Sequence, residues 1–128
     1  MVEEVLANKY GIDRGGHHSA IADGVDPQGR PTEIKGAVYR RAAKPGGGRY
    51  PGYYQVRGEG HEGLLRTGRG SYLFGVWDRD RGRVLGSRRL PASRVDRILE
   101  RHGHGGHRRG DGLASVRWDR IIDPSDLS

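Results

Sequence analysis

The chain has 128 residues and a formal net charge of +7, with an isoelectric point near 10.2. Its length fits one domain with a core of its own, and the absence of cysteine excludes disulfide bonds and thiolate metal sites. Because the sequence has no apolar run of membrane-spanning length and no signal peptide, we expect no membrane partner and a cytoplasmic location in a prokaryote.

Hydrophobic periodicity and turn residues predict hairpins alternating with helices. In the first half of the chain, the expected elements are a helix over 2–10, a loop over 12–18, strands over 19–25 and 30–39 joined by a turn at 26–29, and a glycine-rich stretch over 42–63 with a short strand at 53–56. The second half is expected to contain strands over 70–77 and 83–90 joined by a turn at 78–82, and then a helix over 92–102. A loop over 102–112, a final strand over 113–122 and a frayed end would follow. The strand over 70–77 is strongly apolar and is the best core candidate.

This order of elements is typical of an α/β (α+β) domain with a central mixed β-sheet of four to five strands flanked by helices. We expect one domain over residues 1–128, with its core in 2–102. Residues 103–128 would add a loop rich in histidine and glycine, followed by a C-terminal strand or tail.

The excess of basic residues favours a polyanionic partner, because binding to nucleic acid releases condensed counterions. The basic residues are clustered, at 40–44, at 79–89 and at 108–109, which favours a binding surface over an inert basic surface. Lysine is rare, and Lys35 is one of only three. Because lysine carries a compact charge that suits a place beside a metal ion and a phosphate, Lys35 is a catalytic candidate.

The turn at 26–29 predicts the register of the first hairpin. Asp-Pro-x-Gly favours a type I turn followed by a left-handed glycine that forms a bulge. Asp26 then faces Arg30, and counting outwards places Asp23 opposite Glu33 at a position where facing side chains lie close. Lys35, two residues after Glu33, shares their face of the sheet. A plain four-residue loop would instead turn Asp23 to the other face.

Two carboxylates that face each other repel unless a cation lies between them. Their oxygen ligands suit Mg²⁺ or Mn²⁺, so Asp23 and Glu33 are metal-binding candidates. The alternative is a surface hairpin with an ordinary ion pair between Glu33 and Lys35, which would contribute little to stability. Asp26 is more simply explained as a turn residue than as a ligand.

A helix that carries an acid, a hairpin with Asp23, the tripeptide Glu-Ile-Lys at 33–35, and a further strand and helix together resemble the PD-(D/E)XK nuclease superfamily. This superfamily includes many restriction endonucleases and the archaeal Holliday-junction resolvases. The resemblance covers about residues 2–102 and implies a restriction-endonuclease-like core. The sequence departs from the motif before Asp23, where Ala22 replaces the proline.

The resemblance also implies roles for individual residues. Asp23 and Glu33 match the metal-binding carboxylates, and Lys35 matches the catalytic lysine. Glu3, or else Glu4, would be the helix-borne acid that some members have.

The reaction implied by the resemblance is hydrolysis of a phosphodiester bond in DNA. A Mg²⁺ or Mn²⁺ ion held by Asp23, Glu33 and the carbonyl of Ile34 would polarise the phosphate and lower the pKa of a bound water. Lys35 would orient that water or stabilise the charge that develops on the phosphate. Restriction-like and junction-resolving enzymes commonly act as homodimers because two strands must be cut, so DNA and a second copy of the chain are the expected partners.

Basic side chains near this motif are the expected contacts to the nucleic-acid backbone. The candidates are His17, His18, Arg40, Arg41, Lys44, Arg49 and Arg57. The two histidines would touch the phosphate or donate a proton, or they are loop residues without a role. Arginine and tyrosine in 44–61 either hold phosphates and stack bases, or Tyr53 and Val56 there simply pack a strand.

The remaining polar and aromatic features indicate less about function. His102, His104 and His107 either bind a transition metal or belong to a flexible loop. His61 stands alone in the sequence. Trp77 and Trp118 are expected to pack in the core.

Three classes of function fit these observations. The first is a metal-dependent DNA endonuclease, either restriction-like or junction-resolving. The second is a non-catalytic basic module that binds DNA or RNA and in which Glu-x-Lys is accidental. The third is a basic protein associated with RNA or the ribosome, which the glycine-rich loops favour but the paired acids do not. Metal-dependent cleavage separates the first from the others.

Overall fold

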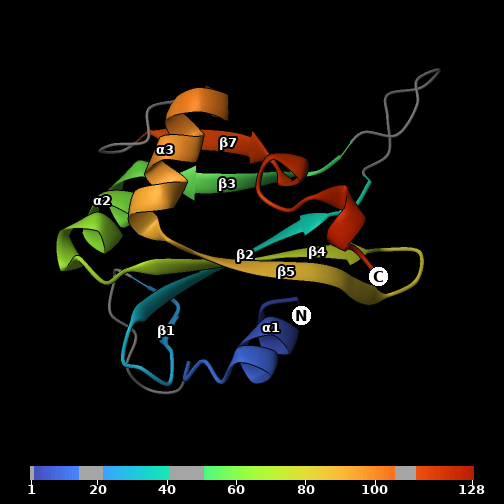
Figure 1. Ribbon diagram of the computed structural model, residues 1–128, viewed down its shortest axis with the longest axis horizontal. Coiled ribbons are helices and arrows are strands. Elements are labelled where there is room, and N and C mark those ends of the chain that lie inside the picture. Colours follow the sequence, from blue (N-terminus) through green and yellow to red (C-terminus); the bar gives the residue numbers. More distant parts are fainter. Residues whose placement is uncertain (1, 15–21, 41–50, 106–111) are drawn as a thin grey trace.

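The computed structural model describes residues 2–14, 22–40, 51–105 and 112–128 (Figure 1). The elements in chain order are α1 (Val2–Tyr10), β1 (Gly24–Val25), β2 (Pro31–Val38), β3 (Tyr53–Arg57), α2 (Gly58–Thr67), β4 (Ser71–Asp78), β5 (Arg83–Pro91), α3 (Ala92–His102), β6 (His104–Gly105), β7 (Leu113–Arg117) and the 3₁₀ turns η1 (Trp118–Arg120) and η2 (Pro124–Asp126). None of the described helices is long and apolar enough to span a membrane.

The main sheet has four strands in the order β1-β2-β4-β5. The outer pairs are antiparallel hairpins and the central pair, β2 with β4, is parallel, so the sheet is mixed. The predicted α/β (α+β) class with a central mixed sheet flanked by helices is therefore confirmed. Residues 71–76 of β4 are all buried, as expected for a strand covered on both faces.

The two faces of the main sheet carry different layers (Figure 1). α1 covers one face, where Leu6 packs with Ile34 and Leu73. The other face carries α2, α3 and a second antiparallel sheet of order β3-β7-β6. The larger core lies between the two sheets, where the ring centroids of Tyr54 and Phe74 are 4.6 Å apart.

Several predicted elements have the expected limits, and others do not. The helices over 2–10 and 92–102 and the hairpin of residues 71–91 are confirmed. The first hairpin is present, but its first strand, expected over 19–25, covers only Gly24–Val25 among the described residues. Residues 58–63, expected to be part of the irregular glycine-rich stretch, instead form the first part of α2. His61 and Leu64 are completely buried in this helix, so packing outweighs the weak helix propensity of glycine.

The C-terminal part of the chain also differs from the prediction. The expected strand over 113–122 stops at Arg117, where the chain turns into η1 and buries Trp118. The Trp118 indole N–H donates to the Tyr39 carbonyl at 2.9 Å. The end is not frayed: the Ser128 N–H donates to the Leu85 carbonyl on β5 at 3.0 Å. The core placement of Trp118 is confirmed, whereas Trp77 is only half-buried.

Gly75 marks the closest approach of α1 to the main sheet, because a methyl group added there would lie 2.5 Å from the Leu6 Cδ1. Gly75→Ala should therefore lower the free energy of unfolding by about 1–3 kcal/mol through overpacking. The matched control is Gly60→Ala, where an added methyl meets nothing within 4 Å. It should leave stability unchanged or raise it by up to about 1 kcal/mol. Urea unfolding measures both, and equal stability of the two variants would contradict this packing.

Candidate active site

The turn between β1 and β2 determines which side chains face each other at this end of the main sheet. Gly29 adopts a left-handed φ of 76° and donates its N–H to the Asp26 carbonyl at 2.9 Å. The Asp26 N–H donates to the Arg30 carbonyl at 3.1 Å. The two strands pair in the register that the sequence predicts, with Gly29 in the bulge. Asp23 is thereby brought to Glu33.

Asp23 and Glu33 form a hydrogen bond between their carboxyl groups. Burial, followed by the neighbouring Asp23, raises the pKa of Glu33 to about 8. At neutral pH Glu33 is therefore the protonated partner and donates to Asp23. Burial alone would also raise the pKa of Asp23, but this hydrogen bond and the Ile34 N–H, 2.9 Å from Oδ2, outweigh it and lower that pKa. The two carboxyl groups share one proton.

Two cationic side chains lie near this carboxyl pair. Lys35 follows Glu33 on β2 by two residues, so the two side chains share one face of the sheet. The charges of Lys35 and Arg14 both lower the pKa of Asp23 and of Glu33. Arg14 follows α1 in the chain and was not expected in the site. The pair of acids is thus flanked by cations that could contact a phosphate group.

The residues of the carboxyl pair fit a hard divalent cation. Across the described ranges 2–14, 22–40, 51–105 and 112–128, no group of three or more His, Asp or Glu side chains is placed to hold a metal ion. The pair supplies two carboxylates, and water and a main-chain carbonyl commonly complete such a shell. A cation in place of the shared proton would relieve the repulsion between two ionised carboxylates. The donor chemistry therefore suits Mg²⁺ or Mn²⁺.

Glu33 lines a pocket of about 340 Å³ beside the first turn of α2. We call it the Glu33 pocket, and it is lined by Glu33, Lys35, Arg57, Glu59, Gly60, His61 and Tyr72. It brings Arg57, a predicted nucleic-acid contact, to the same cavity as Lys35. It also places a helix-borne acid, Glu59, near Glu33.

A buried histidine network fixes the wall of the Glu33 pocket. His61 is completely buried, and its Nδ1 lies 2.8 Å from the Tyr72 hydroxyl. Its Nε2 lies 2.9 Å from the Asp96 Oδ1 on α3. Tyr72 pairs with Glu33 across β4 and β2, and burial raises the pKa of Tyr72, so its hydroxyl stays protonated. The network ties α2, α3 and β4 together next to Glu33.

The structure does not bring Glu3 to the carboxyl pair. α1 packs on the face of the main sheet that carries Ile34 and Gly36, whereas Glu33 and Lys35 project from the opposite face. Glu3 instead lines a cavity with Val2, Val5, Gly36, Trp77, Gly82, Arg83 and Val84. Glu4 is exposed on α1.

The predicted contacts to nucleic acid are only partly within the described residues. Arg57 lines the Glu33 pocket. Arg40 is exposed just beyond β2, with its guanidinium 4.9 Å from the ring centroid of Tyr39. The others lie outside the described residues: His17, His18, Arg41, Lys44, Arg49 and, from the histidine tract, His107.

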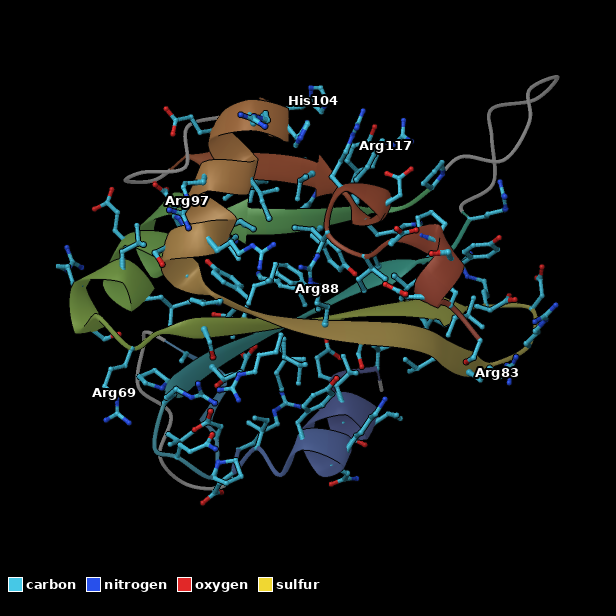
Figure 2. All side chains as sticks on the ribbon, viewed as in Figure 1. Arg69, Arg83, Arg88, Arg97, His104 and Arg117 are labelled. Carbon is cyan, nitrogen blue, oxygen red and sulfur yellow. The ribbon has the colours of Figure 1, made fainter. Side chains whose placement is uncertain are left out.

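A second basic surface lies along α3. A groove of about 710 Å³ is lined by Arg88, Arg94, Arg97, Ile98, Glu100, Arg101, His102 and Arg120. Figure 2 shows Arg97 on α3 and Arg88 above β5, on the same side of the main sheet. The Arg88 guanidinium also donates to the Ile121 carbonyl at 2.7 Å, which fixes part of this surface.

Sequence reasoning missed Arg14, Glu59, His61, Tyr72 and Asp96 as parts of the site. His61 lies 11 residues from Tyr72 and 35 residues from Asp96 in the sequence, and only the tertiary fold brings these three together. One usable signal was the pair of strands 31–38 and 71–78: their parallel alignment places Tyr72 opposite Glu33. The isolated His61 gave no such signal.

Comparison with protein-family models gives a match over most of the chain. The family model described as PD-(D/E)XK nuclease superfamily domain matches residues 1–123 of the chain. No curated protein matches the sequence.

The shared proton should make stability depend on pH. The Glu33 carboxyl loses its proton near its usual pKa of 4.5 when unfolded and near 8 when folded. Between these values the folded state holds the extra proton, so the free energy of unfolding should fall as pH rises. The slope is at most about 1.4 kcal/mol per pH unit, and less because Glu33 is only partly buried. Urea unfolding in chelator from pH 5 to 9 measures it.

Glu33→Gln keeps a donor for Asp23 but cannot titrate, so its slope over this range should be smaller. Added Mg²⁺ should stabilise the unmodified chain most at pH 8 and should do little for this variant. Glu4→Gln, an exposed acid on α1, is the matched control and should behave like the unmodified chain. Identical slopes for all three chains would show that Glu33 does not hold the proton.

Proposed function

The chain belongs to the PD-(D/E)XK nuclease superfamily, whose members are nucleases that usually use divalent metal ions, and we propose that it is a metal-dependent endonuclease that hydrolyses DNA phosphodiester bonds. One observation carries this proposal: the register of the first hairpin brings Asp23 to Glu33, and Lys35 lies on the same face of β2 as Glu33. Two half-buried acids that face each other repel when both are ionised, and a bound cation would relieve that repulsion. The motif Asp23…Glu33-x-Lys35 is the one that names the superfamily, apart from its first residue.

The carboxylates of Asp23 and Glu33 and the carbonyl of Ile34 would hold Mg²⁺ or Mn²⁺. Such an ion polarises the phosphate and lowers the pKa of a bound water. Lys35 orients the attacking water or stabilises the negative charge that develops on the phosphate oxygens. Its proximity to both carboxyls supports this role, because its charge lowers the pKa of each.

The other side chains of the Glu33 pocket would position the substrate. Arg57 and Arg14 would contact phosphates next to the scissile bond, since Arg57 lines this pocket and the charge of Arg14 acts on Glu33. His61 would keep the Tyr72 hydroxyl and the first turn of α2 fixed beside Glu33. These contacts are to the backbone, so they would position DNA without reading its sequence.

The class of DNA substrate is inferred from the basic groove along α3, and the number of copies from the reaction itself. The arginine-lined groove along α3 supports a protein that binds backbones and recognises the shape of DNA, such as a junction-resolving enzyme, more than a reader of a specific sequence. A restriction-like enzyme is the other possibility within this class. Because cutting two strands needs two active sites, the working form would be a homodimer.

The test is cleavage of plasmid, linear duplex, four-way junction and single-stranded DNA with Mg²⁺ or Mn²⁺. The unmodified chain should cut at least one of them. Glu33→Ala and Lys35→Ala should each lower the rate by about 10²- to 10³-fold. Both should still bind DNA, because the basic surfaces remain. Glu4→Ala and Lys9→Ala change exposed residues of the same types on α1 and serve as controls.

The substrate cut fastest identifies the subclass. Equal cleavage by Lys35→Ala and Lys9→Ala would remove Lys35 from the mechanism. If none of the chains cuts any substrate and all bind alike, catalysis is wrong and a basic DNA- or RNA-binding module remains.

A further inference from the structure

A second pocket lies at the end of the main sheet, where three elements meet. It has a volume of about 410 Å³ and is lined by Arg30, Leu64, Leu65, Gly68, Arg69, Gly70, Ser71, Arg89, Pro91, Ala92 and Ser93. We call it the arginine pocket. Its three arginines come from the β1–β2 hairpin, the end of α2 and β5, and no residue of its lining is acidic.

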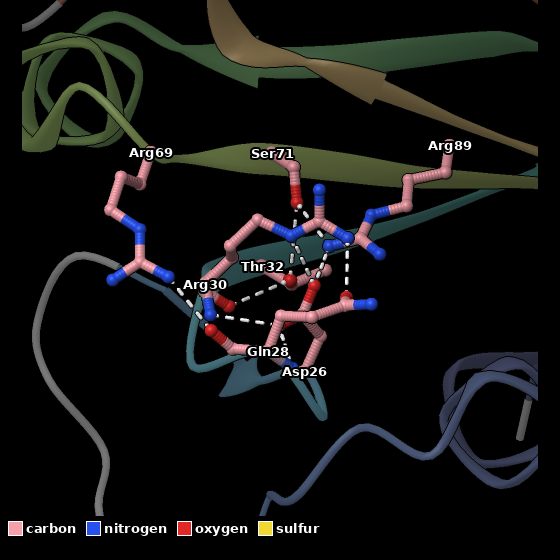
Figure 3. A network of polar contacts seen from close by, with 7 residues as sticks. All are labelled: Asp26, Gln28, Arg30, Thr32, Arg69, Ser71 and Arg89. Atoms are coloured by element: carbon pink, nitrogen blue, oxygen red, sulfur yellow. Dashed lines mark hydrogen bonds and ion pairs between the residues drawn. The ribbon is translucent and has the colours of Figure 1, made fainter.

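Asp26 contacts two of these arginines, Arg30 and Arg89, and its oxygens are already used (Figure 3). The Asp26 side chain is fully buried, and its Oδ1 accepts the N–H groups of Gln28 at 2.9 Å and Arg30 at 2.8 Å. Its Oδ2 accepts Arg30 Nε at 2.7 Å and also Arg89 Nη2. Arg69 donates instead to the Gln28 carbonyl at 2.7 Å. Three positive charges therefore meet one negative charge, an excess of two.

One buried donor of this cluster has no acceptor. Among the described residues, Arg89 Nε is buried without a hydrogen-bond partner. An unsatisfied buried donor is costly, and burial also lowers the pKa of Arg89. Arg89 Nη2 contacts the Ser71 hydroxyl at 3.2 Å, so the guanidinium is held in place. α3 begins at this pocket, and its first turn carries no acidic side chain and no side-chain cap.

We propose that Arg30, Arg69 and Arg89 form a binding site for a phosphate group of the nucleic acid, separate from the Glu33 pocket. Guanidinium groups match phosphate oxygens in pairs, and a group of charge near −2 would balance the local excess. The ligand is either a terminal phosphate monoester, of charge near −2, or an internal phosphodiester, whose single negative charge would balance half of the excess. The inference rests on the proposed function, because it takes nucleic acid as the ligand.

α2 connects the two pockets. Its first turn lines the Glu33 pocket at Gly60 and His61, and its second half lines the arginine pocket at Leu64 and Leu65. The two pockets are therefore neighbours along one helix, and the bound phosphate would belong to a nucleotide near the scissile bond.

The test measures binding of duplex oligonucleotides with a 5′-phosphate or a 5′-hydroxyl in chelator, so that no cleavage occurs. Arg69→Ala should weaken binding about tenfold or more and lower the slope of log K against log salt by about one. Arg66→Ala is the matched control: it lies one turn earlier on α2, with its side chain 74% exposed and outside the pocket. Its effect should be less than about twofold. Arg89→Lys keeps a charge for Asp26 and should also weaken binding.

If the 5′-phosphate strengthens binding and Arg69→Ala removes that difference, the ligand is the terminal monoester. If Arg69→Ala weakens both oligonucleotides equally, the ligand is an internal phosphodiester. Equal effects of Arg69→Ala and Arg66→Ala would overturn the pocket, since only diffuse attraction would remain. If the two variants bind DNA equally well and the unmodified chain still cuts DNA, the phosphate site is wrong and the nuclease assignment stands. A specific Arg69 effect without any metal-dependent cleavage refutes catalysis and keeps the phosphate site.

Discussion

The register of the first hairpin is the constraint on which the candidate active site depends. In a strand, a shift of one residue moves every side chain to the opposite face. Such a shift in β2 would turn Glu33 and Lys35 towards α1 and would separate Glu33 from Asp23. The register is fixed by the three-residue turn with Gly29 at a left-handed φ and by the buried carboxylate of Asp26. Asp26 thus contributes to the site although it lies outside it.

The parts of this site that could be predicted from the sequence are those set by local geometry. The turn residues are adjacent in the chain, so the pairing of Asp23 with Glu33 follows from counting along two strands. The ends of α1 and α3 are marked by apolar stripes and glycines, which are also local signals. The PD-(D/E)XK resemblance, first drawn from these residues, extends over nearly the whole chain.

The parts that could not be predicted depend on contacts between distant segments. α2 has three glycines in ten residues and forms because tertiary packing buries one side of it. The pairing of β3 with β7 joins segments about sixty residues apart, and neither strand alone indicates its partner. His61 illustrates the difference: in the sequence it is one histidine among glycines, whereas in the fold it connects Tyr72 to Asp96. Glu3 lies away from the carboxyl pair because α1 covers the opposite face of the main sheet, and the sequence does not indicate which face a helix covers.

The arrangement of the two pockets has a consequence for the reaction products. Both are built on the main sheet as well as on α2, because Glu33 and Lys35 lie on β2, Arg30 directly precedes β2 and Arg89 lies on β5. Hydrogen-bonded strands do not stretch, so the spacing between the bound phosphate and the site of bond breakage would be fixed. If that phosphate is the terminal monoester, the nuclease would release fragments of uniform size, counted from the end of the strand that it holds.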